Sequence, residues 1–169
     1  MFKVNEKTKK LDDDKKSTFH TFVMKAMFLC KRARPDIEPD ICFLSSRTSK
    51  PDESDWQKSI RTLEFLKGTK DAILTLWAND MNILYWFIDA AFAVHGDMRS
   101  HSGLMSTMGK GAIISSSKKQ KTNSRSSTEA ELNATDEMLS KIMRIKKFVE
   151  EQGFEIKLNI VFQDNTSVL

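Results

Sequence analysis

Two aspartates in the second half of the chain stand where chemistry is possible. Asp89 is the one charged residue in the apolar run 83–94, and Asp164 ends the mostly apolar segment 160–164. Burying an isolated carboxylate is costly unless a cation or hydrogen-bond donors compensate it. If the two segments form neighbouring parallel strands, the two carboxylates lie side by side and repel each other. A divalent cation between them would turn this liability into a binding site.

A third carboxylate is expected from the start of a long helix, where Glu129 and Glu131 are the candidates. Glu131 lies two helical turns before Met138, so it shares the buried stripe of the helix and faces the sheet. Glu129 lies about two and a half turns before Met138 and points the other way. We therefore choose Glu131.

Asp89, Glu131 and Asp164 are hard oxygen donors, with no His or Cys among them. Such a set favours magnesium or manganese over zinc. It suits phosphodiester hydrolysis with two metal ions about 3.5–4 Å apart. Each residue alone also has a structural explanation, because aspartates are common in turns and Glu131 fits a capping box starting at Thr128. The spacing by itself does not decide between the two interpretations.

A basic stretch from Gly109 to Arg125 leads into this helix and contains no acidic residue. Its cations are Lys110, Lys118, Lys119, Lys121 and Arg125, with Gln120 and several Ser, Thr and Asn residues between them. Such side chains and backbone N–H groups are the usual contacts to nucleic-acid phosphates. The alternative is an ordinary solvated loop, and a neighbouring metal cluster favours the phosphate-binding interpretation.

Three helices are predicted in the first half of the chain. The spacing of apolar residues predicts one between Ser17 and Pro35, a short second one over 37–46, and a third that ends at Gly68. Residues 1–16 mix Lys with Asp and predict a flexible charged tail. The expected organisation is a tail over 1–16, a helical segment over 17–71 and an α/β domain over 72–169.

The apolar pattern changes at Ala72 from helical spacing to strand-like runs. Strands are expected over 72–77, 83–94, 103–108 and 112–116, followed by a long helix over 128–152 and a last strand over 158–163. The continuous apolar run 83–94 is typical of a strand buried on both faces. The final helix–strand step favours a parallel pairing of the last strand. We therefore expect an α/β fold with a mixed sheet of three strands, a long helix and a parallel fourth strand.

Composition narrows the class of protein without deciding its activity. The chain is 40% hydrophobic and 30% charged, which suits a soluble globular protein, and its formal charge of +4 is compatible with a nucleic-acid partner. Its two cysteines lack the spacing of a zinc site or a disulfide framework. No apolar run is long enough for a membrane span or forms a secretory signal. We therefore expect an intracellular protein, in the cytoplasm or nucleus, with no membrane partner.

Several short motifs resemble the Pol polyprotein of copia-type retrotransposons. Those in the second half are DAAFA at 89–93, RSHSG at 99–103, SKKQK at 117–121, SSTEAEL at 126–132 and QDNTS at 163–167, and they resemble its RNase H domain. Those in the first half are RPDI at 34–37, FLSS at 43–46 and TLEFLKGT at 62–69, and they resemble the thumb or connection segment that ends the reverse transcriptase. The most specific pair is SSTEAE followed by QDN. The resemblance covers residues 17–169.

This resemblance implies an RNase H-like fold that cleaves the RNA strand of RNA–DNA hybrids, with magnesium or manganese as cofactor. It implies that Asp89, Glu131 and Asp164 are catalytic, metal-binding carboxylates. Gln120 and Asn165 become weaker candidates for nucleic-acid contacts, beside the cations of the basic stretch.

Departures from the family pattern bear on activity. The paired polymerase aspartates of the family lie upstream of the matched region, so no DNA polymerase activity is expected. The family's later helix and fourth carboxylate lie beyond Leu169, so we expect a domain that is incomplete at its C-terminus. Ser115 stands where many members have Trp, and Met24 where many have Gly. Three interpretations stay open: a hydrolase impaired by truncation, a nucleic-acid-binding remnant without catalysis, and an inert pseudogene product that barely folds.

Overall fold

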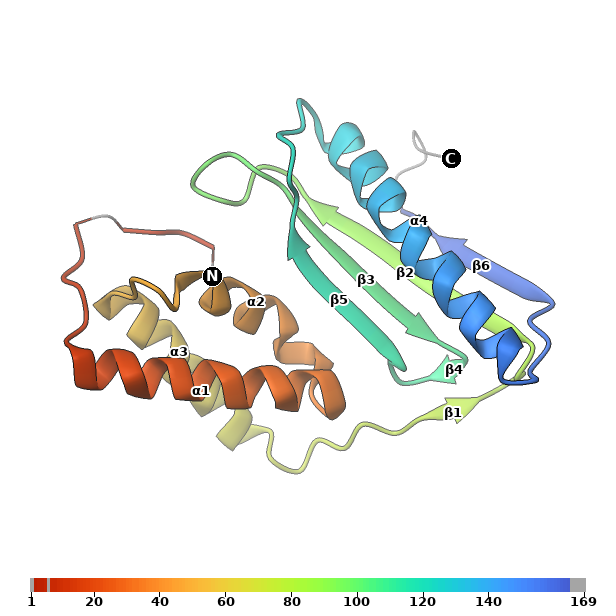
Figure 1. Ribbon diagram of the computed structural model, residues 1–169, viewed down its shortest axis with the longest axis horizontal. Helices are drawn as coiled ribbons and strands as arrows, with labels where there is room; N and C mark the ends of the chain where they lie inside the picture. Colours follow the sequence, from red (N-terminus) through yellow and green to blue (C-terminus); the bar gives the residue numbers. More distant parts are fainter. Residues whose placement is uncertain (1, 6, 165–169) are drawn as a thin grey trace. The chain divides into compact units, whose positions relative to one another are not determined.

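The computed structural model describes residues 2–5 and 7–164. The chain divides into two units between Ile73 and Leu74 (Figure 1). Each unit has its own hydrophobic core, as separately packed domains do. None of the helices in the described part of the chain combines the length and apolar character that a membrane span requires.

Among its described residues, the first unit contains three α-helices and one short 3-10 helix. They are α1 (Asp13–Arg32), η1 (Pro35–Ile37), α2 (Glu38–Arg47) and α3 (Glu53–Gly68). The buried core residues come from α1, η1 and α2. Arg34 is buried and donates hydrogen bonds to the Asp36 carboxylate and to the Thr69 carbonyl. The RPD sequence therefore has a structural role, joining the start of η1 to the end of α3.

The first helix begins five residues earlier than predicted, since Ser17 was the expected N-cap. Asp12 is its N-cap, so Ser17 lies inside the helix. Lys9, just before it, accepts a hydrogen bond through its carbonyl from the Glu53 N–H. The prediction of a flexible tail is therefore wrong for residues 9–16. The reason is the acidic run that begins at Asp12, since aspartates stabilise the N-terminal end of a helix.

The second unit is built on a four-stranded sheet in the order β5–β3–β2–β6 (Figure 1). Its elements are β2 (Ile83–Ala91), β3 (His101–Thr107), β5 (Ile114–Lys119), α4 (Ser127–Glu151) and β6 (Leu158–Phe162). β3 is antiparallel to β2 and β5, whereas β6 pairs with β2 in parallel. The predicted α/β class, with a long helix leading to a parallel fourth strand, is confirmed, and the arrangement is consistent with an RNase H-like fold.

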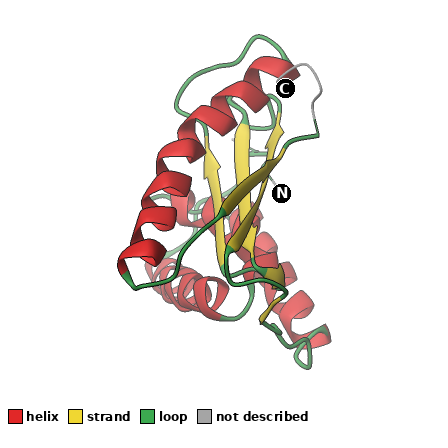
Figure 2. Cartoon of the chain, turned by 90° about the vertical axis from the view of Figure 1, so that its right-hand side faces the viewer, coloured by secondary structure: helices red, strands yellow, loops and turns green. Residues whose placement is uncertain are grey.

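One face of this sheet is covered by α4 (Figure 2). Alternate residues of β2 point to that face, and Leu84, Trp86 and Ile88 are all buried there. They pack with Met138 and Ile142 of α4 in one core cluster. This packing fixes the helix on β2, which is the strand that carries Asp89.

The prediction that β2 is buried on both faces is wrong. Phe87 is 41% exposed and stacks on Phe162 of β6, with ring centroids 4.8 Å apart. Aromatic residues suit a half-buried face as well as a core, so the apolar run did not reveal the alternation. β2 also ends at Ala91 rather than residue 94, because Ala93 has a φ of 51°, outside the range of an extended strand. Asp89 is exposed because it alternates with the buried residues of β2, as Phe87 does.

β3 and β6 differ from their predicted ranges by one or two residues at their ends, and two other strands differ more. The strand expected over 72–77 is reduced to β1 (Trp77–Ala78), which pairs with β4 (Gly109–Lys110). Ile73 is 86% exposed, so its apolar side chain has no core to pack against. β5 continues to Lys119, three residues beyond its predicted end, and part of the expected basic loop is therefore a strand.

Candidate metal centre

The parallel pairing of β2 and β6 brings Asp89 and Asp164 level with each other. The ladder ends at the pair Phe87 and Phe162, and each aspartate stands two residues further along. Side chains two residues apart on an extended chain point to the same side. Both aspartates are exposed, at the end of the sheet where the two strands separate.

Glu131 comes from the first turns of α4. Ser126 is the N-cap and accepts the backbone N–H of Glu129, while the Glu129 carboxylate accepts the backbone N–H of Arg125. The Glu129 side chain therefore helps to cap the N-terminus of α4. Glu131 is buried against the sheet, only 6% exposed. The prediction that Glu131 rather than Glu129 faces the sheet is confirmed, and helical phase is the reason.

Two hydrogen bonds hold the Glu131 carboxylate in place. Its Oε1 accepts the backbone N–H of Ala90 at 3.1 Å, and its Oε2 accepts the side-chain N–H of Gln163 at 3.1 Å. Gln163 in turn accepts the backbone N–H of Asp164 at 2.8 Å. Ala90 directly follows Asp89, and Gln163 directly precedes Asp164. The helix carboxylate is thus tied to both strands that carry the aspartates.

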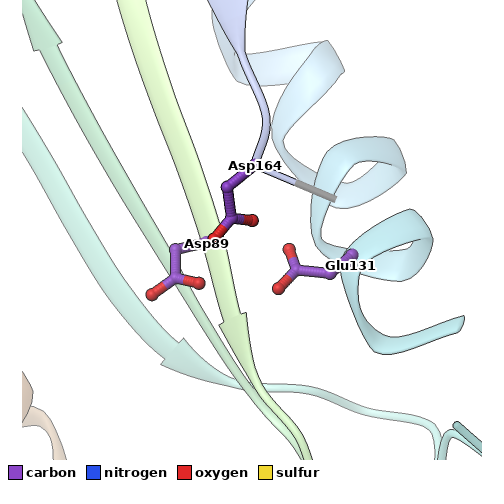
Figure 3. A group of neighbouring side chains, drawn as sticks. All are labelled: Asp89, Glu131 and Asp164. Atoms are coloured by element: carbon purple, nitrogen blue, oxygen red, sulfur yellow. The ribbon is translucent and has the colours of Figure 1, made fainter. Parts of the chain in front are cut away.

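The three carboxylates converge on one space (Figure 3). One oxygen atom from each of Asp89, Glu131 and Asp164 lies within 4.8 Å of the other two. Like charges this close repel each other. Hard oxygen donors in this number and spacing suit a divalent cation such as Mg²⁺ or Mn²⁺.

Burial raises the pKa of Glu131 above its ordinary value. The hydrogen bonds from Ala90 and Gln163 lower this pKa, and the charges of Asp89 and Asp164 raise it. Burial and repulsion therefore disfavour the ionised form of Glu131, and a bound divalent cation would relieve both costs. The residues present fit a divalent metal ion.

The cations predicted to bind nucleic acid are not equivalent. Lys118 lies 3.0 Å from a Glu137 carboxylate oxygen on α4, and Lys119 lies 2.7 Å from an Asp97 carboxylate oxygen. Both lysines stand on β5 rather than in a loop. The basic stretch has no acid in its own sequence, but the fold supplies one acid to each of these two lysines.

The remaining predicted contacts fall into three groups. Lys121 and Arg125 are exposed in the connection between β5 and α4. Gln120 is only 1% exposed and donates to the Ser102 hydroxyl and to a backbone carbonyl of α4, so we no longer regard it as a nucleic-acid contact. Asn165 lies outside the described residues.

Gln163 and the Ala90 N–H are groups of the centre to which the sequence analysis assigned no role, although both stand in the motifs QDNTS and DAAFA. Both are immediate neighbours of predicted ligands, and that adjacency was the available signal. Gln163 reaches α4, where it also contacts the Thr135 hydroxyl at 3.3 Å. Only the three-dimensional arrangement shows that these neighbours converge on Glu131.

Known proteins similar to this chain include plant transposon polyproteins. It is 31% identical over 155 residues, 91% of its length, to the retrovirus-related Pol polyprotein from transposon TNT 1-94 of Nicotiana tabacum. It is 31% identical over 134 residues, 78% of its length, to the Pol polyprotein from transposon RE2 of Arabidopsis thaliana. The chain belongs to the family of copia-type retrotransposon Pol polyproteins. The relationship predicted from its motifs is confirmed.

The chain spans only 12% and 9% of those two Pol polyproteins. It is also 34% identical over 114 residues to the secreted RxLR effector protein 161 of Plasmopara viticola, a match that covers 66% of this chain and 79% of that protein. No protein-family model and no solved structure matches the chain. The Pol relationship therefore rests on sequence, and the geometry of the centre is an independent observation.

Proposed function

We propose that this chain contains the RNase H module of a copia-type Pol polyprotein and hydrolyses the RNA strand of RNA–DNA hybrids. The observation that carries the proposal is the convergence of Asp89, Glu131 and Asp164 within 4.8 Å at one end of an RNase H-like sheet. Membership in the Pol family supports the nucleic-acid substrate. The hydrolysis, its substrate and its metal dependence are the content of the proposal.

The three carboxylates have different parts in the proposed reaction. Bound Mg²⁺ or Mn²⁺ would supply activation of a water molecule and charge stabilisation at the leaving oxygen. Asp89 and Asp164 are exposed and offer their oxygens on the side open to a substrate. Glu131 is buried and held by two hydrogen bonds. Its carboxylate is therefore preorganised, and little rearrangement is needed when the substrate arrives.

Lys121 and Arg125 are the cations best placed to hold the substrate backbone. They are exposed and lie directly before the helix that presents Glu131. Lys118 and Lys119 also stand nearby in sequence, but each has a carboxylate partner that competes with phosphate. In this proposal the partner is an RNA–DNA hybrid, and Lys121 and Arg125 bind its phosphates beside the candidate metal centre.

A cleavage assay on an RNA–DNA hybrid with labelled RNA tests the proposal. Magnesium-dependent cleavage is expected from the unaltered chain, and Asp89→Asn should lower the rate by about a thousandfold, equivalent to roughly 4 kcal/mol in the barrier. Asp136→Asn is the matched control, because Asp136 is an exposed aspartate on the same helix as Glu131. This control should cleave at the rate of the unaltered chain.

Two results would overturn the proposal. Cleavage that persists in Asp89→Asn would show that another site or a contaminating nuclease is responsible. A cooperatively folded chain that binds the hybrid without cutting it, in magnesium and in manganese, would leave the alternative of a nucleic-acid-binding module without catalysis.

A further inference from the structure

Gln120 occupies a buried polar position between the sheet and the start of α4. It directly follows β5, and its backbone N–H donates to the Ser100 carbonyl at 2.9 Å, which continues the pairing with the β3 side. Its side chain is 1% exposed. A side chain that served only to fill this space would be apolar, since a buried amide is unfavourable unless its hydrogen bonds are made.

The Gln120 amide is bonded at both ends. Its Nε2 donates to the Ser102 hydroxyl at 3.0 Å and to the Ala130 carbonyl at 2.8 Å. Its Oε1 accepts the Ser124 hydroxyl at 3.1 Å, and Ser124 accepts the side-chain N–H of Asn133 at 3.1 Å. One side chain thus connects β3, the connection before α4 and the first turns of the helix.

Ala130 is the residue directly before Glu131. The carbonyl that Gln120 holds is therefore part of the peptide unit from which the Glu131 ligand extends. From this peptide unit, the Glu131 side chain extends to the backbone N–H of Ala90 on β2. A small shift of this helical turn would move the Glu131 carboxylate away from Asp89 and Asp164.

We propose that Gln120 is a positioning residue that fixes the first turns of α4 so that Glu131 is held in the metal centre. The inference rests on the proposed function for its purpose, but it makes a claim about geometry that can be tested without cleavage. Removal of the Gln120 hydrogen bonds should loosen the contact of Glu131 with Ala90 and weaken metal binding. Groups that orient metal ligands typically affect affinity about 10–100-fold when removed.

Gln120→Met tests this inference because it keeps the approximate volume of the side chain and removes the three side-chain hydrogen bonds, while the backbone bond to Ser100 stays. Ile142→Val is the control, since Ile142 is a buried core residue of the same helix about 16 Å beyond Glu131 along its axis. The two readouts are the hydrogen-exchange rate of the Ala90 N–H in EDTA and the affinity of the chain for Mn²⁺ alone. Each is compared under conditions in which the variants have the same free energy of unfolding. Gln120→Met should speed Ala90 exchange and weaken Mn²⁺ binding by about tenfold, and Ile142→Val should change neither.

Gln120→Met values within twofold of Ile142→Val for both readouts would overturn the inference. If Gln120→Met does not fold, Ser124→Ala replaces it, since it removes the hydroxyl that joins Gln120 to Asn133. That variant should move both readouts in the same direction, and unchanged readouts would again refute the role. A Gln120 effect in a chain that cleaves no hybrid would refute the proposed function and leave this inference standing.

Discussion

The Glu131 carboxylate accepts the backbone N–H of Ala90 at 3.1 Å. That N–H lies beyond the last pair of the β2–β6 ladder, so β6 supplies no partner for it. The Glu131 side chain of α4 accepts this N–H in place of a backbone group of β6. The hydrogen bond holds the Glu131 carboxylate at the end of the sheet where Asp89 and Asp164 lie. The convergence of the three carboxylates thus follows from where the parallel ladder stops.

Charge repulsion in the centre should destabilise the chain when no metal is present. Burial and the two aspartates raise the pKa of Glu131 above its ordinary value of 4.5. A raised pKa means that the stability from the protonated form is complete below pH 4.5 and is lost as the pH rises through the folded-state value. At pH 7 in EDTA, Asp89→Asn should therefore be more stable than the unaltered chain by about 1 kcal/mol.

Denaturant unfolding at pH 7 and pH 4 checks this prediction. The advantage of Asp89→Asn should shrink at the lower pH, and Mg²⁺ should stabilise the unaltered chain more than the variant. Lower stability of Asp89→Asn at pH 7 in EDTA would contradict the idea that the carboxylates repel each other.

Gln163 should favour the ionised form of Glu131. Because its side chain donates to Glu131 Oε2, this hydrogen bond lowers the pKa of Glu131. Gln163→Leu should therefore make Glu131 titrate at a higher pH than in the unaltered chain, measured by carboxyl NMR in EDTA. Thr135→Val is the control, because it removes the other partner of the Gln163 amide and leaves the bond to Glu131. A Glu131 titration that is unchanged, or that moves to lower pH, in Gln163→Leu would contradict this role of the bond.

His101 should make the stability of the chain depend on pH. It is buried, shares a hydrogen bond of 3.0 Å with His95 and another of 2.6 Å with the Ser117 hydroxyl. Burial, and secondarily the charge of His95, lower the pKa of His101 from 6.5 to about 4. A lowered pKa means that this stability is fully present above pH 6.5 and is lost as the pH falls towards 4.

Denaturant unfolding of His101→Gln tests this account. The stability difference between the unaltered chain and His101→Gln should be largest near pH 7 and should shrink towards pH 4. Other acidic groups titrate in the same range, but the comparison between the two proteins cancels their contribution. A difference that is constant over this range would show that His101 does not titrate with a lowered pKa.

The salt dependence of hybrid binding should separate the exposed cations from the paired ones. Each phosphate contact contributes about 1 to the slope of log affinity against log salt concentration. In EDTA, which prevents cleavage, the double substitution of Lys121 and Arg125 by Gln should lower this slope by about 2. The double substitution of Lys118 and Lys119 should lower it less, because Glu137 and Asp97 already neutralise these lysines. Equal changes in slope would contradict the distinction.

Those features of the fold that depend on strong local patterns were predictable from the sequence. The spacing of Glu131 from Met138 along α4 fixed which glutamate faces the sheet. The order of helix and strand at the end of the chain fixed the parallel pairing of β6. Together these two predictions located the three carboxylates near one another.

Features that depend on the surroundings of a residue were not predictable. The apolar side chains of residues 72–77 suggested a strand, but the only part of this segment that pairs in the described structure is Trp77, in the two-residue strand β1. Lys118 and Lys119 looked like free cations, and their acidic partners come from distant parts of the sequence. Gln120 looked like a surface residue in a polar stretch, and only the position of α4 makes it part of the interior.

The most direct test of the account is a crystal structure of the chain grown with Mn²⁺, with the metal located by its anomalous scattering. We expect an anomalous peak between Asp89, Glu131 and Asp164, with carboxylate oxygens at metal-bonding distance, and no such peak in Asp89→Asn. A structure of the unaltered chain in saturating Mn²⁺ with no peak among these three residues would contradict the claim that they form a metal centre.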